Sequence, residues 1–277
     1  MKTEPFFRQN ESTLMIKEWE SFDASLKAGF STRVGGTSVN GYNSLNVGLH
    51  VNDIDSNVIK NREKIAEILR IPLNQWVFSD QVHKAQIHHV TKSDKGKGAF
   101  NYENAIKATD GLYTREKGIM LALCYADCVP VYFYAPSHQL IGIVHAGWKG
   151  TVENIVGQMI STWTKNEGVS TNDIYIAIGP SIEECCYIVD DRVIEALTTL
   201  LGDQARHTFK EVSTGQYRLN LKLANQIICE KNGIDSNHIL VSKDCTSCNE
   251  ELFFSHRRDK GSTGRMMSFI GFEEDES

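Results

Sequence analysis

The 277-residue chain lacks any apolar run long enough to cross a membrane as a helix, which takes about 20 residues. Its first residues, MKTEPFFRQNEST, are polar within a few positions and contain no signal-peptide core. A net charge of −6 gives no sign of the basic stripe that is typical of nucleic-acid-binding proteins. These absences predict a cytoplasmic protein that binds neither a membrane nor nucleic acid.

Linkers and repeats are also missing. The chain contains no internal repeat, no Pro/Ser-rich linker and no low-complexity segment, and 41% of its residues are hydrophobic. A single chain of this length buries roughly three quarters of its unfolded surface. We therefore expect one domain over residues 1–277, with only an acidic tail from about residue 272 to 277 frayed.

The cysteine pattern does not fit a secreted disulfide framework. Seven cysteines are an odd number, and no secretory signal accompanies them. The motif CTSC, from Cys245 to Cys248, has metal or redox spacing but no second C-x-x-C to complete a four-ligand site. We interpret these two thiols as structural, and the adjacent pair Cys185 and Cys186 as structural or substrate-lining.

Nucleotide-binding motifs are absent or incomplete. The chain has no G-x-G-x-x-G, and GWKGT at 147–151 lacks the adjacent Gly-Lys-Ser/Thr of a P-loop. As a turn into a helix, this segment can hold an anion with help from Lys149. The alternative, that its glycines only allow a tight turn, is slightly favoured on physical grounds. The basic segment HRRDKGSTGR is likewise either a phosphate-facing turn or a solvated loop.

Hydrophobic periodicity predicts strands and helices that are mixed without strict alternation. The continuous apolar runs at 119–124, 131–134 and 140–145 are typical of strands covered on both faces. Strands are also expected at 13–19, 26–32, 76–79, 86–90, 173–179, 238–242, 251–255 and 266–272, and helices at 56–70, 151–163, 190–202 and 219–233. This order favours an α+β class, an α/β sandwich with mixed central sheets flanked by helices, over a doubly wound fold.

Helix-end signals accompany these predictions. Ser56 and Thr151 are the expected N-caps of the helices that begin near them. Gly202 and Gly233 are expected to end the two later helices.

Cys128 and His145 are brought together by the predicted hairpin. Pro130 cannot donate a ladder hydrogen bond, so we expect the strand to be interrupted there and Cys128 to occupy an irregular position. The strands at 131–134 and 140–145 flank the turn APSHQ and are expected to run antiparallel. The start of one then lies beside the end of the other. A thiol and an imidazole so placed are suited either to zinc or copper or to a nucleophile–base pair.

An open catalytic metal site needs a third ligand. His83, His88 and His89 are the candidates, and His83 lies in a loop, where it is freer to point into a cleft than the two strand histidines. The residue types alone leave this choice open.

A set of ordered motifs covers nearly the whole chain. In order they are FSTRVGGTS, YNSLNVGLHVND, DQVH, TDGLYT, YADCVPV, VHAGWKG, IGPSIEECCYIV and FFSHRRD with TGRM. Together they resemble the YfiH/YlmD family, also called the multicopper polyphenol oxidase or laccase-domain family, and in particular its purine nucleoside phosphorylase members. Lys84 stands where this family pattern leads us to expect Gly, and His256 where we expect Tyr.

The resemblance implies a fold similar to the catalytic domain of cytotoxic necrotising factors. It also implies a metal, Zn²⁺ or alternatively copper, held by His83, Cys128 and His145. The expected substrates are purine nucleosides and phosphate: the family is described as phosphorolysing adenosine, inosine, guanosine and methylthioadenosine and as deaminating adenosine. Older descriptions make its members copper-dependent phenol oxidases.

This chemistry assigns roles to further residues. Deamination needs acidified water that attacks C6 of adenine, and Asp127 is the candidate proton shuttle. Phosphorolysis needs phosphate held near C1′, for which cationic side chains are suited. The candidate substrate-binding residues are Arg33, Lys149 and Arg258 for phosphate and Ser31 and Asn46 for the nucleoside. Ser31 and Asn46 have turn formation as their alternative role.

Three other functions compete with this one. A laccase-like oxidase normally needs many histidines, and the nine here form no H-x-H pair. A metal-free cysteine hydrolase would use Cys128 as nucleophile and His145 as base. A non-enzymatic binding module is the remaining class.

Overall fold

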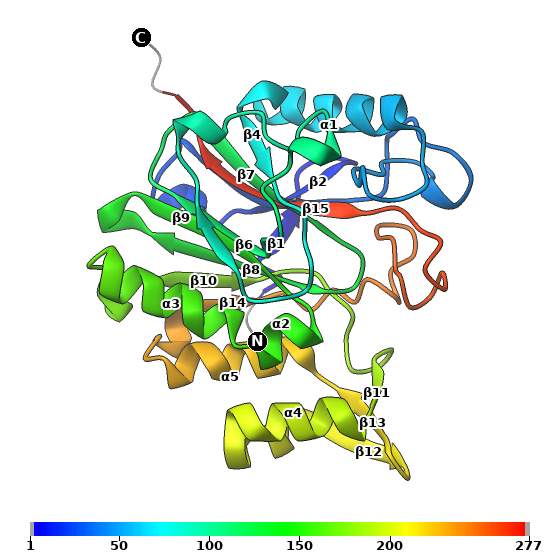
Figure 1. Cartoon of the computed structure of the whole chain (residues 1–277), viewed down its shortest axis with the longest axis vertical. Helices are drawn as coiled ribbons and strands as arrows, with labels where there is room; N and C mark the ends of the chain where they lie inside the picture. The colour runs from blue at the N-terminus through cyan, green and yellow to red at the C-terminus, as the bar shows by residue number, and fades with distance from the viewer. Residues whose placement is uncertain (1–2, 275–277) are drawn as a thin grey trace.

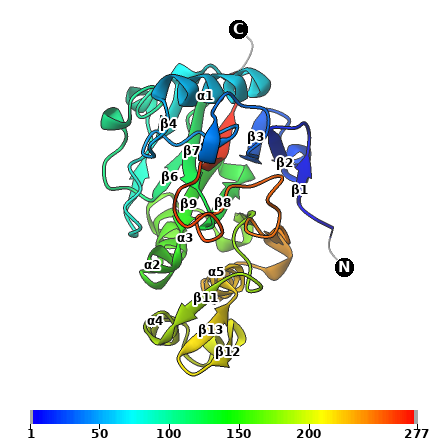
Figure 2. The ribbon, with the colours of Figure 1, turned by 90° about the vertical axis from the view of Figure 1, so that its right-hand side faces the viewer.

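The computed structural model describes residues 3–274 and has a layered α/β architecture (Figure 1). Two mixed sheets lie face to face, and helices cover their outer faces. The helices are α1 (Asp55–Leu69), α2 (Trp148–Val152), α3 (Ile155–Asn166), α4 (Asp191–Leu201) and α5 (Leu221–Lys231). α1 covers one sheet, whereas α2, α3 and α5 cover the other (Figures 1 and 2).

The first sheet is antiparallel except for the pairing of its last two strands. Its order is β1 (Phe6–Arg8), β2 (Thr13–Ile16), β3 (Leu26–Ser31), β15 (Met266–Phe272), β7 (Ile119–Tyr125) and β4 (Trp76–Phe78). The C-terminal strand β15 thus lies in the middle of the sheet, between β3 and β7.

The second sheet contains the predicted hairpin. Its order is β14 (Ile239–Val241), β10 (Tyr175–Ile178), β8 (Val129–Ala135), β9 (Leu140–Ala146), β6 (Gly111–Thr114) and β5 (Ile87–His89). A smaller sheet of β11 (Ile188–Asp190), β13 (Gln216–Leu219) and β12 (Phe209–Ser213) extends with α4 beyond the layers (Figure 2).

Alternate side chains of the central strands are buried on opposite faces of the sheets, which explains why the sequences of these strands are continuous apolar runs. Leu121 and Leu123 of β7 pack between the two sheets, whereas Met120 and Ala122 pack toward α1. In β8, Tyr132 faces the other sheet while its neighbours face the helices. Both faces of these strands are therefore covered, as their composition predicts.

Two helix starts differ from the predictions. α1 begins at Asp55 after Ile54, so Ser56 lies inside the helix and is not its N-cap. The helix predicted at 151–163 is two helices, because Asn154 adopts a left-handed conformation at φ 63° that breaks the helical path. Thr151 accordingly lies within α2. Gly202, by contrast, ends α4 as predicted.

Several strand predictions also need correction. Residues 251–255 form turns and irregular backbone rather than a strand, and β2 ends at Ile16 instead of Trp19. Within the tail that was expected to fray from about residue 272, Phe272 is buried in β15, and the described residues continue to Glu274. The rest of that tail, 275–277, lies outside the described residues. Single-domain organisation and the similarity to cytotoxic necrotising factors stay predictions.

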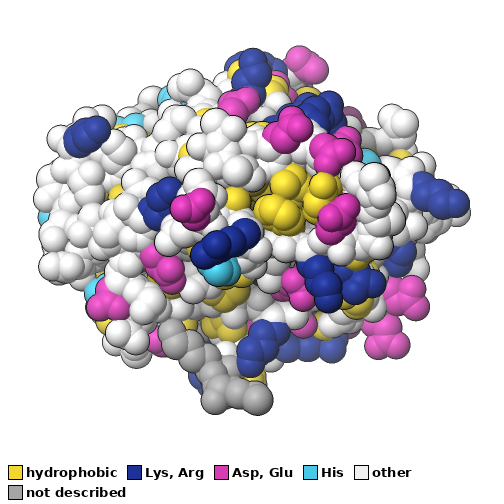
Figure 3. All heavy atoms as spheres, turned by 90° about the horizontal axis from the view of Figure 1, so that it is seen from below, with side chains coloured by type: hydrophobic (Ala, Val, Ile, Leu, Met, Phe, Trp, Pro, Cys, Tyr) yellow, Lys and Arg dark blue, Asp and Glu magenta, His cyan; other side chains and the backbone are white. Residues whose placement is uncertain are grey.

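Among the described residues, none of the helices combines the length and apolar character needed to cross a membrane. On the face seen from below in Figure 1, acidic and basic side chains are interspersed, and neither sign forms a continuous patch there (Figure 3).

Candidate active site

The β8–β9 hairpin places Cys128 beside His145. Val129 pairs with Ala146 and Pro130 with His145, so Cys128, one residue before β8, lies next to the end of β9. The irregular position predicted for Cys128 is confirmed, because residues 126–128 form a bend. The predicted interruption at Pro130 is wrong. Pro130 lies within β8, and its carbonyl accepts a hydrogen bond from the Gly179 amide at 2.9 Å.

Asp110 holds the loop that carries His83. Its buried carboxylate accepts hydrogen bonds from the backbone amides of Val82, His83 and Lys84 at 3.0–3.1 Å. Three successive amides around one carboxylate hold His83 at a positive φ of 60°. The same carboxylate accepts from Nδ1 of His145 at 2.8 Å. Nδ1 therefore carries the proton, and Nε2 of His145 is left to bind a ligand.

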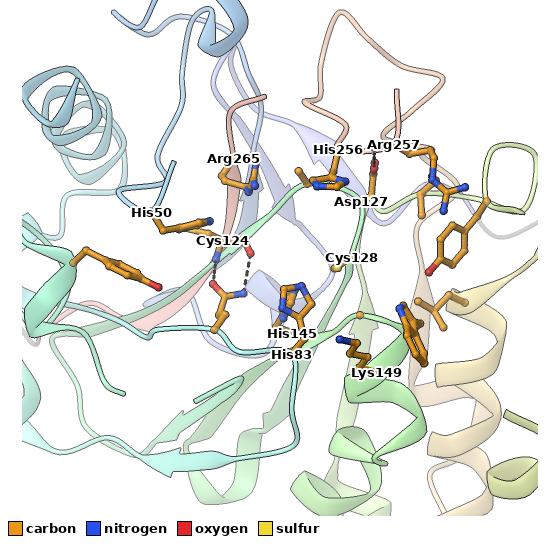
Figure 4. Close-up of a pocket in the computed structure, with 18 residues that line it drawn as sticks. His50, His83, Cys124, Asp127, Cys128, His145, Lys149, His256, Arg257 and Arg265 are labelled. Carbon is orange, nitrogen blue, oxygen red and sulfur yellow. Dashed lines mark hydrogen bonds between the residues drawn. The ribbon is translucent and has the colours of Figure 1, made fainter. Parts of the chain in front are cut away.

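His83, Cys128 and His145 converge on one point (Figure 4). Their ligand atoms all lie within 4.8 Å of one another, and the two imidazole rings are 4.8 Å apart at an interplanar angle of 77°. Gly147 allows this approach, because a Cβ there would lie 3.0 Å from Sγ of Cys128 and 3.4 Å from the His83 ring. Two imidazoles, one thiolate and an open fourth side fit a catalytic zinc or copper ion.

The electrostatics of the centre favour an ionised thiol. Burial by itself raises the pKa of Cys128, but the charges and hydrogen bonds of His145 and His83 lower it to about 6. Burial would lower the pKa of His145, but Cys128 and Asp110 raise it to about 9. Without a metal, this pair is a thiolate beside an imidazolium, which is suited to act as a nucleophile and its proton donor. Metal binding would release the proton from Nε2 of His145.

The centre lies in a pocket of about 490 Å³, a volume that is ordinary for a small-molecule site. The residues around the three candidate ligands are mostly aromatic, basic or amide side chains. They include His50, Gln81, Tyr102, Trp148, Lys149, Tyr187, His256, Arg257 and Arg265. Lys149 was predicted to bind phosphate, and His256, Arg257 and Arg265 belong to the segment HRRDKGSTGR, for which a phosphate-facing turn was one of two alternatives. The other residues of this set were missed by motif reasoning. The quoted motifs LHVND, DQVH, GWKG, CCYIV and HRRD nevertheless contain several of them.

Two of these lining residues are fixed by clear contacts. The Gln81 side chain donates to the Cys124 carbonyl at 2.8 Å and accepts from the Cys124 amide at 2.7 Å, so it ties the His83 loop to β7 (Figure 4). The Arg257 guanidinium lies over the Tyr187 ring at 5.1 Å and donates to the Ile188 carbonyl. Arg257 lines the pocket together with Lys149 and Arg265.

Of the five predicted substrate-binding residues, Lys149 lines the pocket and four others do not. Ser31 is buried and accepts a hydrogen bond from the Met267 amide. Asn46 is buried too, and it bonds Asp53 and the Arg265 amide.

The two arginines among those four hold loops. Arg33 donates to the carbonyls of Asn43 and Glu250 and lies over Phe254. Arg258 binds Asp259 and the backbone around Thr246. Arg33 and Arg258 thus hold the FSTRVGG and HRRD segments in place.

Asp127, the candidate proton shuttle, lines the pocket but its carboxylate is occupied. It accepts from the hydroxyls of Thr246 and Ser255 at 2.7 and 3.0 Å and from the Arg257 amide at 2.7 Å. Asp127 thus ties the Cys128 bend to two loops of the pocket rim. Its role as a shuttle stays a prediction.

The two-sheet fold and the His–Cys–His centre in a polar pocket define a class of α/β enzyme with a candidate metal site. The chain belongs to the family described as multi-copper polyphenol oxidoreductase laccase, whose family model matches residues 27–273. This confirms the family resemblance seen in the sequence motifs.

Individual relatives agree with this assignment. The chain is 50% identical over 273 residues, 98% of both chains, to a Bacillus subtilis protein named purine nucleoside phosphorylase YlmD. A protein of the same name from Geobacillus stearothermophilus is 51% identical over 252 residues, 91% of this chain and 92% of its own. Among solved structures, the Bacillus licheniformis hypothetical protein YfiH superposes with a TM-score of 0.95 at 50% identity, covering 98% of this chain and 100% of its own.

Proposed function

We propose that this protein is a purine nucleoside phosphorylase that also deaminates adenosine, with a metal ion at its active centre. The observation that carries the proposal is the convergence of His83, Cys128 and His145 in a pocket of about 490 Å³ lined by cations and aromatic rings. The names of the relatives point the same way, since the 50%-identical Bacillus subtilis protein is named a purine nucleoside phosphorylase.

The cationic side chains supply the phosphate site in this proposal. Lys149, Arg257 and Arg265 line the pocket around the His–Cys–His centre. Charge-assisted hydrogen bonds from such groups to phosphate are stronger than bonds between neutral groups. Phosphate held by them is positioned to attack C1′ of the nucleoside, and its negative charge stabilises the oxocarbenium-like ribosyl group as the glycosidic bond breaks. Adenosine, inosine, guanosine and methylthioadenosine share the bond that reacts.

The aromatic side chains supply the nucleoside site. Tyr102, Trp148 and Tyr187 line the pocket, and His50 packs on Tyr102 with ring centroids 5.8 Å apart. Rings of this kind stack on purine bases, whose faces are flat and polarisable. Because Tyr187 and Trp148 lie beside the cations, base and phosphate would be bound close to each other.

The metal-binding residues would be His83, Cys128 and His145, with zinc as the proposed ion and copper as the alternative. A bound zinc ion supplies a Lewis acid that lowers the pKa of water to near neutrality, which deamination at C6 of adenine requires. Asp110 accepts a hydrogen bond from Nδ1 of His145, so Nε2 is the ring nitrogen that would face the ion. Asp127 fixes the bend that presents Cys128 and is the nearest carboxylate in sequence for proton transfer.

Two other functions have an observation in their favour. The family description favours copper-dependent oxidation of phenols. Among residues 3–274, however, His83–Cys128–His145 is the histidine-containing cluster suited to a metal, and it offers ligands for one ion. The thiol pKa of about 6 favours a metal-free hydrolase with Cys128 as nucleophile.

The decisive experiment measures products and bound metal together. Adenosine and inosine are incubated with the purified protein, with and without phosphate, and bases, deaminated nucleoside and ribose 1-phosphate are quantified. The proposal predicts phosphate-dependent ribose 1-phosphate and phosphate-independent deamination. His83→Ala, Cys128→Ala and His145→Ala should each lose both activities together with one bound metal ion per chain. His89→Ala is the matched control, because His89 is exposed on β5 and stacks on Tyr113 outside the pocket.

Each competing function has its own outcome. Full turnover after complete metal removal, together with a covalent adduct on Cys128, would establish the hydrolase. Oxygen consumption with phenols that depends on added copper, without any phosphorolysis, would establish the oxidase. Unchanged activity and metal content in all three alanine variants would refute the proposed centre.

A further inference from the structure

Four cysteines that are distant in the sequence meet at one place on the surface. Cys185 and Cys186 lie in the loop between β10 and β11, and Cys245 and Cys248 lie in the loop that follows β14. Sulfur–sulfur distances are 3.7 Å for 185–186, 3.8 Å for 185–245, 3.5 Å for 185–248 and 3.3 Å for 186–248. All four sulfur atoms lie within 4.8 Å of one another. The adjacent pair thus completes the four-thiol set that CTSC lacked in the sequence.

We propose that these four thiols form a structural Zn²⁺ site that is separate from the His83 centre. A tetrahedral zinc ion with Zn–S bonds of about 2.3 Å places its sulfur ligands about 3.8 Å apart. The sulfur–sulfur distances of 3.3–3.8 Å are close to this value. They are far longer than the roughly 2.05 Å of a disulfide bond. Four thiolates fill a tetrahedral zinc ion, so the site is closed and structural rather than catalytic.

The backbone around the sulfur atoms supports a thiolate cluster. The Glu183 amide donates to Sγ of Cys245 at 3.4 Å, a contact that stabilises negative charge on sulfur. Ser181 and Cys245 form a β-bridge between the two loops, and the Thr246 amide donates to the Ser181 carbonyl at 3.1 Å. The loops are therefore held together by backbone contacts before any ion binds.

A buried lysine ties the same two loops together and contributes positive charge. Lys222 of α5 forms an ion pair with Glu183 at 2.6 Å and donates to the carbonyls of Ser242 and Asp244 at 2.9 and 2.8 Å. Asp244 precedes the first cysteine of one pair, and Glu183 stands two residues before the other pair. A zinc ion with four thiolates carries a net charge of −2, which a fixed lysine near both loops offsets in part.

The proposed ion would hold one wall of the pocket. Ile182 and Tyr187, on either side of the adjacent cysteines, both line the pocket. The Ile182 amide donates to the Asp127 carbonyl at 2.9 Å, and Thr246 donates to the Asp127 carboxylate at 2.7 Å. Both cysteine loops thus contact the bend that presents Cys128.

Binding needs no oxidant or reductant. Four thiols bind Zn²⁺ through their sulfur atoms and release their protons to solvent, and no electrons are transferred. Cys185 and Cys248 are exposed, so an ion can enter from solvent, and the same exposure leaves the metal-free thiols open to oxidation.

The test separates the two metal sites by mutation. Zinc per chain is measured by mass spectrometry in His83→Ala, where the His–Cys–His centre is disabled, and in His83→Ala combined with Cys185→Ser or Cys248→Ser. We expect about one zinc ion per chain in the first variant and its loss in both double variants. Cys229→Ala in the same background is the control, because Cys229 is buried in α5 away from the cluster and should leave the zinc in place.

Two measurements keep the proposal falsifiable if a variant folds poorly. Wild-type protein refilled with Co²⁺ should show the intense sulfur-to-cobalt absorption of a tetrahedral thiolate site, and this absorption should persist in His83→Ala. A thiol reagent should modify the four cysteines slowly, and at least tenfold faster after a chelator is added. The proposal is overturned by zinc-free His83→Ala with four freely reactive thiols, or by a mass two daltons lower that reveals a disulfide among them. Because no readout uses turnover, this result stands apart from that of the proposed phosphorylase.

Discussion

Asp110 illustrates how a residue that binds no ligand can determine the geometry of a site. Its carboxylate accepts hydrogen bonds from three backbone amides of the His83 loop and from Nδ1 of His145. One buried group therefore orients two of the three candidate ligands. Those contacts join residues 26 to 35 positions apart in the sequence, beyond any local spacing rule. Hydrogen bonds from such a residue to the metal-binding side chains control the basicity and the orientation of those side chains.

Asp110→Asn should weaken metal binding without unfolding the protein. The amide keeps the size of the carboxylate but turns an acceptor into a donor, and it removes the charge that fixes the His145 proton on Nδ1. We expect zinc affinity to fall about 10- to 100-fold, measured by competition with a chromogenic chelator. Asp173→Asn is the matched control, because Asp173 makes a similar contact with Nδ1 of His138, at 2.9 Å, outside the pocket. Equal affinities in the two variants would contradict this role.

The sequence predicted part of the site for a clear reason. Cys128 and His145 belong to one hairpin, and hairpin register follows from strand length and turn position. His83 was identified only through the family resemblance, because it reaches the centre from a loop held by Asp110. The four-cysteine cluster was missed because its two pairs are about 60 residues apart, and only the packed fold brings them together.

Among the elements, prediction succeeded for the long strands that are buried on both faces and failed for several short strands. β7, β8 and β9 are apolar throughout and were found. β12 is largely exposed, and its sequence FKEVS carries no apolar run. Phe253 and Phe254 suggested a strand, yet both are buried side chains of an irregular segment. Burial of single side chains from a loop produces the same local pattern as a short strand.

The break between α2 and α3 rests on the conformation of Asn154. Its φ and ψ of 63° and 40° are left-handed, and its side-chain oxygen is buried without a hydrogen-bond partner. Asn154→Gly should change the free energy of unfolding by no more than about 0.5 kcal/mol, because glycine adopts this conformation freely. Asn154→Val should cost about 1–2 kcal/mol, because a branched Cβ is strained there. Urea denaturation measures both, and equal costs would show that backbone strain is not the cause.

Asp94 links the stability of the turn after β5 to pH. Burial raises the pKa of Asp94, but hydrogen bonds from Lys97, the Thr91 amide and His88 outweigh it and lower the pKa to about 2. The native pKa is thus below the ordinary value of 3.8, so the carboxylate stabilises the fold above about pH 4. This contribution is lost as the pH falls toward 2.

Asp94→Asn should therefore lower the free energy of unfolding at pH 7 by about 1–2 kcal/mol. This range allows for solvent screening of the ion pair between Asp94 and Lys97, because the Lys97 side chain is about half exposed. The difference from wild type should shrink steadily between pH 4 and pH 2.5 in urea titrations. Asp235→Asn is the comparison variant, because Asp235 caps an exposed turn with a hydrogen bond to the Asn237 amide at 2.8 Å and should have a smaller effect. If Asp94→Asn and wild type differed equally in free energy of unfolding at both ends of the pH range, the Asp94 carboxylate would not be the cause.

At the scale of the whole molecule, the three candidate metal ligands come from segments that belong to different sheets. His83 comes from the loop after β4 of the first sheet, and Cys128 from the bend that leads from β7 of that sheet to β8 of the second. His145 comes from β9 in the second sheet. An ion bound by all three therefore connects the two sheets at one edge of the sandwich. Such a site exists only in the folded chain, so ion binding adds directly to the stability of the fold.

Zinc should consequently raise the melting temperature of the metal-free protein more in wild type than in His83→Ala. At a free zinc concentration 100-fold above the dissociation constant, one site contributes about 2.7 kcal/mol. For a chain of 277 residues that corresponds to an increase of about 5 °C in the midpoint of thermal unfolding. The difference between the two proteins isolates the His–Cys–His centre, because a zinc ion on the four cysteines would stabilise both alike. Equal shifts in the two proteins would mean that the three residues meet without binding an ion.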